Sequence, residues 1–224
     1  AWTKRRLLHY LYDSEVKAYF FILVSAFALT FLTLGIYLEN PGDNLIQESA
    51  FQVVSIATTT GFLTSNYSNW PLFVPILLLF TAFIGACAGS TGGGIKVIRT
   101  LVLAKQSAGE ITKLIHPNAV ISIKLGKKAV SSRVAESVWG FFSIYVIVFI
   151  ILFMFLLAQG NDFISSFSAV GATLNNLGPG LGDVSNDYQS LNDYSKIGLS
   201  IAMILGRLEI FTLLVLFTPA FWRK

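Results

Sequence analysis

The sequence predicts an all-α integral membrane protein with two tandem helix–pore-helix–helix repeats around a central pathway. Of its 224 residues, 54% are hydrophobic and 12% are charged, whereas about a quarter of the residues in a soluble domain are charged. The apolar residues gather in four long stretches with shorter ones between them. Most of the basic residues lie in the connecting segments that would face one side of a membrane. Composition, stretch length and charge pattern together place the chain in a membrane.

Four stretches are long enough to cross a bilayer, which takes about 20 mainly apolar residues in a helix. They cover residues 18–38, 70–104, 137–158 and 195–222, and glycines are expected to break the second. Two shorter stretches, 44–57 and 161–172, cannot span the bilayer and are predicted to be re-entrant helices. Asn44 can cap the first of these helices, and Asn161 or Asp162 the second. Turns of poor helix formers follow at residues 58–62 and 173–178.

The basic residues predict the orientation of the chain. Of the 16 Lys and Arg residues, all but Lys196 and Arg207 occur in the segment 1–17, between residues 96 and 136, and at Arg223 and Lys224. No Lys or Arg lies in residues 39–95 or 137–195. By the positive-inside rule, both termini of this chain and the basic link 105–136 are expected in the cytoplasm, and both short helices outside.

The order of span, short helix, turn and span occurs twice. Placing Gly61 on Gly178 brings the two turns and their short helices into register, although few residues are identical. Both halves have the same predicted topology, so the repeats are parallel and not inverted. The pore repeats are therefore predicted at residues 18–104 and 137–224.

A re-entrant helix that enters from outside points its C-terminal carbonyls at the membrane centre, where this negative dipole end favours a cation. The turn that follows can offer backbone oxygens in place of the hydration shell of the ion. A glycine permits the positive φ that aims such oxygens at one axis. The predicted ion-binding filter consists of Thr58, Thr59, Thr60, Gly61, Asn175, Asn176, Leu177 and Gly178. The alternative is that each short helix is an interfacial amphipathic segment with an ordinary polar turn.

Two further features stand out within the spans. The stretch from Gly89 to Gly94 contains four glycines, each of which costs about 1 kcal/mol in a helix interior, so a break at membrane depth is predicted. Close packing of small residues is the alternative. Arg207 lies within the fourth span, where an ionised group costs about 3 kcal/mol, and is therefore a candidate functional residue. Alternatively it holds helices together, but residues two apart do not face each other, which disfavours an Arg207–Glu209 pair.

Other chemistry finds little support in the sequence. The run from Gly89 to Lys96 resembles a phosphate-binding loop, but Ile95 separates Gly94 from the lysine, and a span instead of a strand precedes it. The single cysteine, Cys87, excludes an intrachain disulfide, and His9 and His116 are too far apart for a metal-ligand spacing. No nucleophile–base pair is recognisable. An enzyme, an organic cofactor and nucleic-acid binding are therefore not expected.

With these residues in view, the chain resembles the Trk/Ktr/HKT superfamily of potassium transport proteins, and in particular the bacterial Trk-type membrane subunit. Four motifs in the family's order carry the resemblance, which covers essentially the whole chain. They are residues 55–62 (SIATTTGF), 85–96 (GACAGSTGGGIK), 169–180 (AVGATLNNLGPG) and 206–210 (GRLEI). The first turn is close to the filter pattern of potassium channels, and the second departs from it.

The resemblance implies much about the complete protein. The family builds a pore from four such repeats, so this chain is expected to hold the last two, with the first two carried elsewhere. It implies K⁺ as the transported ion, bound at the filter residues, and a multi-pass location in the bacterial inner membrane among its lipids. It also implies a homodimer and a cytoplasmic nucleotide-binding regulatory subunit. The implied gate comprises an intramembrane loop and a pore arginine, namely Gly89, Gly92, Gly93, Gly94, Lys96 and Arg207.

The expected function is potassium uptake through a carbonyl-lined selectivity filter. A potassium symporter coupled to H⁺ or Na⁺ is an alternative, for which Glu209 is the available intramembrane carboxylate. A membrane scaffold that transports nothing is a second alternative, and it predicts that Gly61 and Gly178 can be replaced by alanine without loss of ion flux.

Overall fold

The computed structural model describes residues 13–37, 44–119, 122–126, 128–216 and 218–222. The predicted basic cluster at Lys4, Arg5 and Arg6, together with His9, Leu38, Arg223 and Lys224, lies outside the described residues. The α-helices are α2 (Ser14–Tyr37), α3 (Leu45–Ala57), α4 (Phe73–Ile84), α5 (Val97–Ile115), α6 (Ser132–Ala158), α7 (Phe163–Leu174), α8 (Asp193–Arg207), α9 (Ile210–Leu216) and α10 (Pro219–Trp222). Two short 3₁₀ helices, η2 (Tyr67–Asn69) and η3 (Gly182–Val184), and a small antiparallel hairpin of β1 (Lys124–Leu125) and β2 (Lys128–Ala129) complete the described elements.

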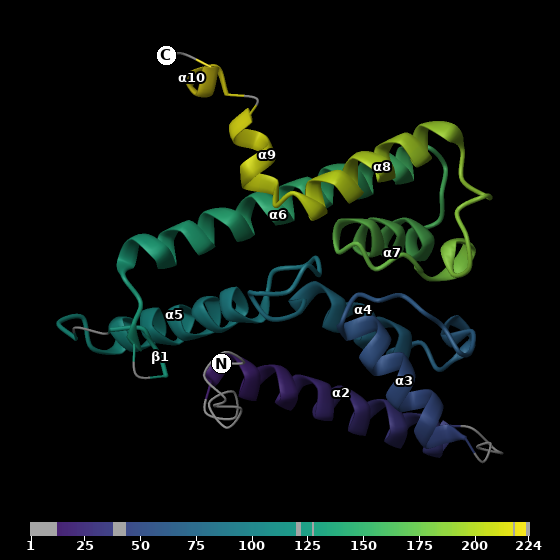
Figure 1. Ribbon diagram of the computed structural model, residues 1–224, viewed down its shortest axis with the longest axis horizontal. Coiled ribbons are helices and arrows are strands. Elements are labelled where there is room, and N and C mark those ends of the chain that lie inside the picture. Colours follow the sequence, from purple (N-terminus) through teal and green to yellow (C-terminus); the bar gives the residue numbers. More distant parts are fainter. Residues whose placement is uncertain (1–12, 38–43, 120–121, 127, 217, 223–224) are drawn as a thin grey trace, which may run out of the picture.

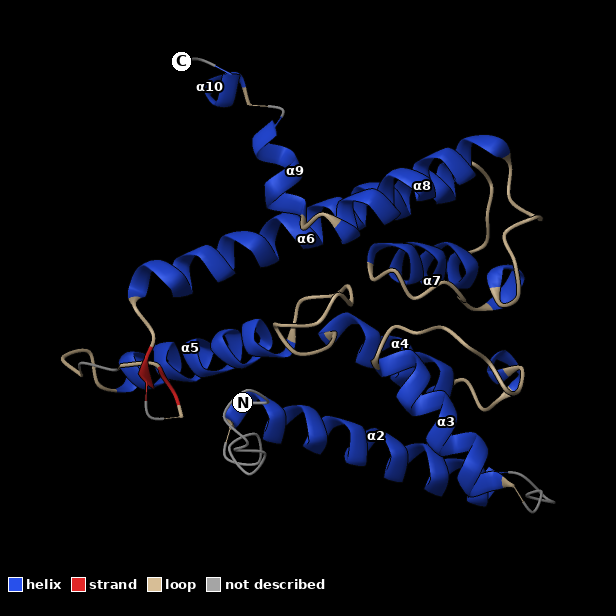
Figure 2. Ribbon diagram, viewed as in Figure 1, coloured by secondary structure: helices blue, strands red, loops and turns tan. Residues whose placement is uncertain are grey.

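The helices form two groups with the same order of elements, which Figures 1 and 2 show one above the other. Helices α2, α3 and α4 pack together in the first group, and α6, α7 and α8 in the second. Helix α4 also packs against α7 and joins the groups. Phe83 on α4 lies at this junction, with its ring centroid 6.3 Å from that of Phe167 on α7 and 5.5 Å from that of Phe149 on α6. The predicted all-α class with tandem span–short-helix–span units is confirmed.

Two helices, α2 and α6, are long and apolar enough to cross a membrane as single helices, judged by length and composition. The predicted second span is divided, because α4 ends at Ile84 and a loop of residues 85–96 precedes α5. The predicted break is therefore present.

The prediction of one continuous helix over residues 195–222 was wrong. Helix α8 ends at Arg207, and α9 begins at Ile210 and leads away from α8 (Figure 1). Between them Glu209 takes a φ of 56°, which a regular helix does not permit. The side chains of Arg207 and Glu209 both bond to groups outside their own helix, at Thr91 and Arg99, and these bonds accompany the change of direction.

Helices extend from both repeats into the expected basic link over residues 105–136. Helix α5 continues to Ile115, and α6 already begins at Ser132. The helix stops where His116 precedes Pro117, since a residue before proline disfavours the helical conformation. A small apolar cluster packs the first turns of α5, through Val102, against the first turns of α6, through Ala135 and Val138.

The two re-entrant helices begin differently. Asp162 caps α7, because its carboxylate accepts hydrogen bonds from the backbone N–H groups of Ile164 (3.0 Å) and Ser165 (3.1 Å). Asn44 occupies the same position before α3, but its side chain makes no capping hydrogen bond, so the cap predicted there was wrong. Burial raises the pKa of Asp162, but the hydrogen bonds from Ser165 and Ile164 outweigh it and leave the pKa below its ordinary value.

This difference predicts unequal effects of two matched substitutions. Asp162→Ala removes a working cap and is expected to lower the free energy of unfolding by about 1 kcal/mol. Asn44→Ala, the control, is expected to change it little. Because the folded-state pKa of Asp162 is lowered, its contribution is present at neutral pH and is lost as pH falls below about 4. Thermal unfolding of the complete protein in detergent measures both, and equal effects would contradict the capping assignment.

Candidate functional site

The two predicted filter turns have the same backbone conformation. In the first, Thr59 has a φ of 54° and Gly61 a φ of 78°; in the second, Asn176 has a φ of 54° and Gly178 a φ of 103°. The Thr60 N–H donates to the Ser55 carbonyl, and the Leu177 N–H donates to the Ala172 carbonyl. Each acceptor lies five residues earlier, at a distance of 2.8 Å. The turns therefore obey the register that the alignment of Gly61 with Gly178 predicts.

The ends of α3 and α7 also converge in space. A Cβ added to Gly61 would overlap the carbonyl oxygen of Leu177 and would lie 3.2 Å from the Pro179 ring. No side chain larger than hydrogen therefore fits between the turns. This close approach brings the eight predicted filter residues of the two repeats into one region.

The second turn rests on a buried amide. Asn175 is fully buried; its side-chain oxygen accepts a hydrogen bond from the Tyr145 hydroxyl (2.8 Å), and its amide nitrogen donates to the Gly171 carbonyl (2.8 Å). Asn176 faces α8. With its amide in the orientation that satisfies both neighbours, it donates to the Met203 carbonyl and accepts from the Arg207 N–H, each at 3.2 Å. The turn is thus braced on two sides.

The glycine-rich loop between α4 and α5 lies against both turns. A Cβ on Gly92 would lie 2.9 Å from the Thr59 hydroxyl oxygen, and one on Gly93 would overlap the Asn175 backbone. On the other side, a Cβ on Gly206 of α8 would overlap the Leu174 carbonyl. Glycine is therefore required at Gly93 and Gly206, where backbones meet, whereas Gly92 faces a side chain that can shift.

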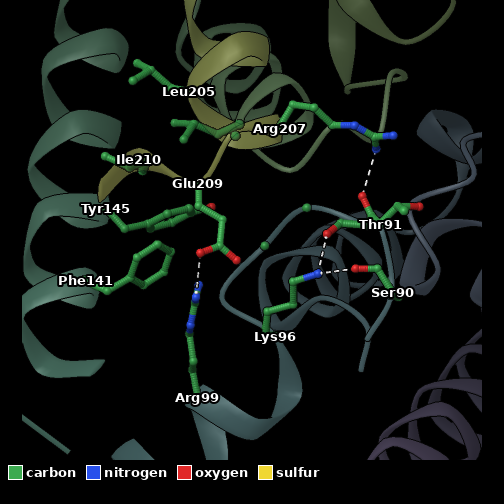
Figure 3. A pocket seen from close by; sticks show the side chains of 15 residues that line it. Ser90, Thr91, Lys96, Arg99, Phe141, Tyr145, Leu205, Arg207, Glu209 and Ile210 are labelled. Carbon is green, nitrogen blue, oxygen red and sulfur yellow. Dashed lines mark hydrogen bonds and ion pairs between the residues drawn. The ribbon is translucent and has the colours of Figure 1, made fainter. Parts of the chain in front are cut away.

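Two basic side chains hold the loop by its carbonyl groups (Figure 3). The buried Lys96 donates from Nζ to the carbonyls of Ser90 (2.6 Å) and Gly92 (2.9 Å). Arg207 reaches over from the end of α8 and donates from Nη1 to the Thr91 carbonyl (2.8 Å). The loop, Arg207 and residues of α6 and α8 line a cavity of about 130 Å³. Of the predicted gate residues, Gly92 and Gly93 therefore lie against the filter turns, and Lys96 and Arg207 bond to the same loop. Gly94 lies against the end of α4, and a Cβ on Gly89 would meet no atom within 4 Å.

Sequence reasoning missed several residues of this site. Arg99 on α5 forms an ion pair with Glu209 (2.9 Å) and stacks over the Phe141 ring, with Cζ 4.2 Å from its centroid. Glu15, at the start of α2, accepts a hydrogen bond from the Ala88 N–H (2.6 Å) and so holds the far end of the loop. These partners are 110 and 73 positions apart, and no local pattern in the sequence signals such a distant pair.

Chemically, the site offers backbone oxygens from two converging turns, a glycine-rich loop against them and a cationic group, Arg207, beside the loop. It has no group of three or more His, Cys, Asp or Glu side chains able to hold a metal, as far as the described residues are concerned. Carbonyl oxygens can replace the hydration shell of a cation, so the arrangement suits an ion in passage.

Comparison with known proteins gives a consistent result. The family described as TrkH, cation transport protein, matches residues 8–224. The Trk system potassium uptake protein TrkH of Escherichia coli K12 is 52% identical over 98% of this chain and 46% of its own length. TrkG of the same organism is 44% identical over 79% of this chain and 36% of its own length. The crystal structure of the potassium transporter TrkH from Vibrio parahaemolyticus matches with a TM-score of 0.89 and 52% identity, over 96% of this chain and 46% of that one. The chain thus spans about half the length of the relatives it matches.

Proposed function

Because the chain belongs to the TrkH family of cation transport proteins, we propose that it forms half of a potassium uptake pore. The observation that carries the proposal is the pair of matching turns. Both follow a short helix, both have positive φ at the same two positions, and they approach so closely that Gly61 leaves no room for a Cβ. Two helix C-termini that converge with their dipoles form a favourable environment for a cation.

In this proposal the filter binds K⁺ through the backbone of Thr58–Gly61 and Asn175–Gly178. The four turns of a complete ring are needed to replace a hydration shell, so the remaining two repeats of the same protein complete the site. The ion bound in the filter is the ion that is transported. Because it binds weakly and at several sites, it can leave the filter again.

The proposed gate is the loop from Gly89 to Gly94 together with Lys96 and Arg207. The support is the position of the loop against both turns and its attachment by hydrogen bonds that involve the side chains of Lys96, Arg207 and Glu15. Such bonds can be exchanged for bonds to water when the loop moves, so closing and opening need not disturb the packed helices.

The surroundings follow from the family and the charge pattern. We infer a homodimer in the bacterial inner membrane, with both ends of this chain and residues 105–136 on the cytoplasmic side. A nucleotide-binding regulatory subunit is expected to dock on that side. The exposed apolar side chains of α2 and α6 face membrane lipid in this arrangement.

A symporter is less well supported than a pore. The carboxylate that could carry a coupling proton, Glu209, is already engaged in an ion pair with Arg99 at 2.9 Å. Glu209 therefore has a structural partner at the α8–α9 break.

The test is ⁸⁶Rb⁺ influx into liposomes that contain the complete purified protein. We expect uptake that K⁺ inhibits at lower concentration than Na⁺ and that needs neither a Na⁺ nor a H⁺ gradient. Uptake that requires one of these gradients would establish the symporter. Influx no faster than in protein-free liposomes would overturn the proposal and favour the alternative of a membrane scaffold that transports nothing.

A further inference from the structure

Two tyrosine hydroxyls hold the outer end of the second filter turn. Tyr188, in the segment between η3 and α8, donates to the Gly178 carbonyl at 2.7 Å. Tyr67, in η2 of the other repeat, donates to the Gly180 carbonyl at 2.8 Å and lies 3.5 Å from that of Pro179. Each repeat therefore contributes one hydroxyl to the same three-residue segment, Gly178–Gly180.

Within the segment Gly178–Gly180, the tyrosine hydrogen bond contributes most to fixing the backbone at Gly178. Nothing lies within 4 Å of a Cβ built on Gly178, whereas Gly61 is in tight contact with Leu177. Gly180 is fixed separately, because its N–H donates to the Val184 carbonyl at 2.9 Å. At Gly178, where no side chain packs and φ is 103°, the Tyr188 hydroxyl is the described contact that restrains the peptide plane.

The first turn is held in a different way. There Ser55, within α3, donates from its hydroxyl to the Phe62 carbonyl at 2.6 Å. In the repeat register Phe62 corresponds to Pro179, one residue beyond Gly178. The two turns thus share positive φ at matching positions, but the carbonyls at their outer ends are held differently. A hydroxyl of the short helix holds Phe62, and hydroxyls of the outer loops hold Gly178 and Gly180.

We propose that Tyr188 and Tyr67 form a clamp that positions the outer carbonyls of the second filter turn and so sets ion selectivity. Both are positioning residues, and the proposal rests on the proposed pore function. The clamp compensates for the sequence Leu177-Gly178-Pro179, which departs from the pattern of a potassium-channel filter. Because it spans both repeats, it also fixes the spacing of the two turns at their outer end.

The hydroxyls remain donors over a wide pH range. Burial raises the pKa of Tyr188, and the neighbouring Tyr67 raises it further; burial also raises the pKa of Tyr67 itself. Deprotonation would leave an anion beside a carbonyl oxygen, which is unfavourable.

The test replaces Tyr188 by phenylalanine in the complete protein, which removes the hydroxyl and keeps the ring. In the liposome assay we expect the total ⁸⁶Rb⁺ influx to be retained. The preference of the protein for Rb⁺ over Na⁺ is expected to fall about fivefold, the effect of one lost hydrogen bond. Tyr67→Phe is expected to act in the same direction. Tyr194→Phe is the matched control, since Tyr194 is an exposed tyrosine at the start of α8.

The outcomes separate the clamp from the pore itself. If wild-type protein is selective and Tyr188→Phe has the same ion preference as Tyr194→Phe, the clamp is overturned and the pore proposal stands. A fall in influx without a change in preference would assign Tyr188 a purely structural role and would equally overturn the clamp. Absence of influx in the wild type would overturn the pore.

Discussion

Gly61→Ala is expected to abolish potassium uptake by the complete transporter. The added Cβ would overlap the Leu177 carbonyl oxygen, and φ at this position is 78°, which costs an alanine roughly 1 kcal/mol or more. The overlapping atom belongs to the backbone of the other filter turn and cannot rotate away as a side chain would. Relief of the clash must therefore separate the two turns. Rubidium uptake by potassium-transport-deficient cells, normalised to the amount of protein in the membrane, measures the loss.

Two glycines of the same chain provide matched controls. Gly178 has a positive φ of 103°, but a Cβ there would meet nothing within 4 Å, so Gly178→Ala tests backbone strain without the clash. It is expected to reduce uptake only in part. Gly35 lies within α2 and also has nothing within 4 Å, so Gly35→Ala is expected to leave uptake unchanged. Normal uptake by Gly61→Ala would show that the turns do not approach each other in the working protein.

Local patterns in the sequence predicted much of this fold. The alignment of Gly61 with Gly178 identified two turns that share even the positive φ of Thr59 and Asn176, which are not glycines. The four glycines between Gly89 and Gly94 predicted the break after α4. These signals are local, because conformational preference and hydrophobic length act within a few residues of each other.

The parts that escaped prediction depend on contacts between distant residues. The α8–α9 break at Leu208 and Glu209 contains neither glycine nor proline, and Arg207 and Glu209 bond there to Thr91 and Arg99 of the other repeat. Tyr188 occurs in a polar loop with nothing to distinguish it from the exposed Tyr194, and only the fold places it beside Gly178. Such partners are chosen by the tertiary structure, so a single sequence does not reveal them.

Arg207→Ala is expected to raise potassium flux about tenfold. Its guanidinium lies beside the loop next to the filter turns, where in the proposed pore a positive charge would oppose the passage of a cation. Two unit charges about 12 Å apart, at an effective dielectric constant of about 20, repel by roughly 1.4 kcal/mol, which corresponds to a factor of about ten in rate. Initial rates of ⁸⁶Rb⁺ influx into liposomes measure the change, and an unchanged or slower influx would contradict the assignment of Arg207 as a barrier.

Arg207→Lys separates the charge from the hydrogen bond. Lysine keeps the positive charge, but its single ammonium group does not reproduce the guanidinium geometry that reaches the Thr91 carbonyl. Lys96 still holds the carbonyls on both sides of Thr91, at Ser90 and Gly92, so the loop has support without Arg207. We therefore expect Arg207→Lys to conduct nearly like the wild type. Flux as high as that of Arg207→Ala would instead mean that Arg207 restrains the pore by tethering the loop and that its charge contributes little.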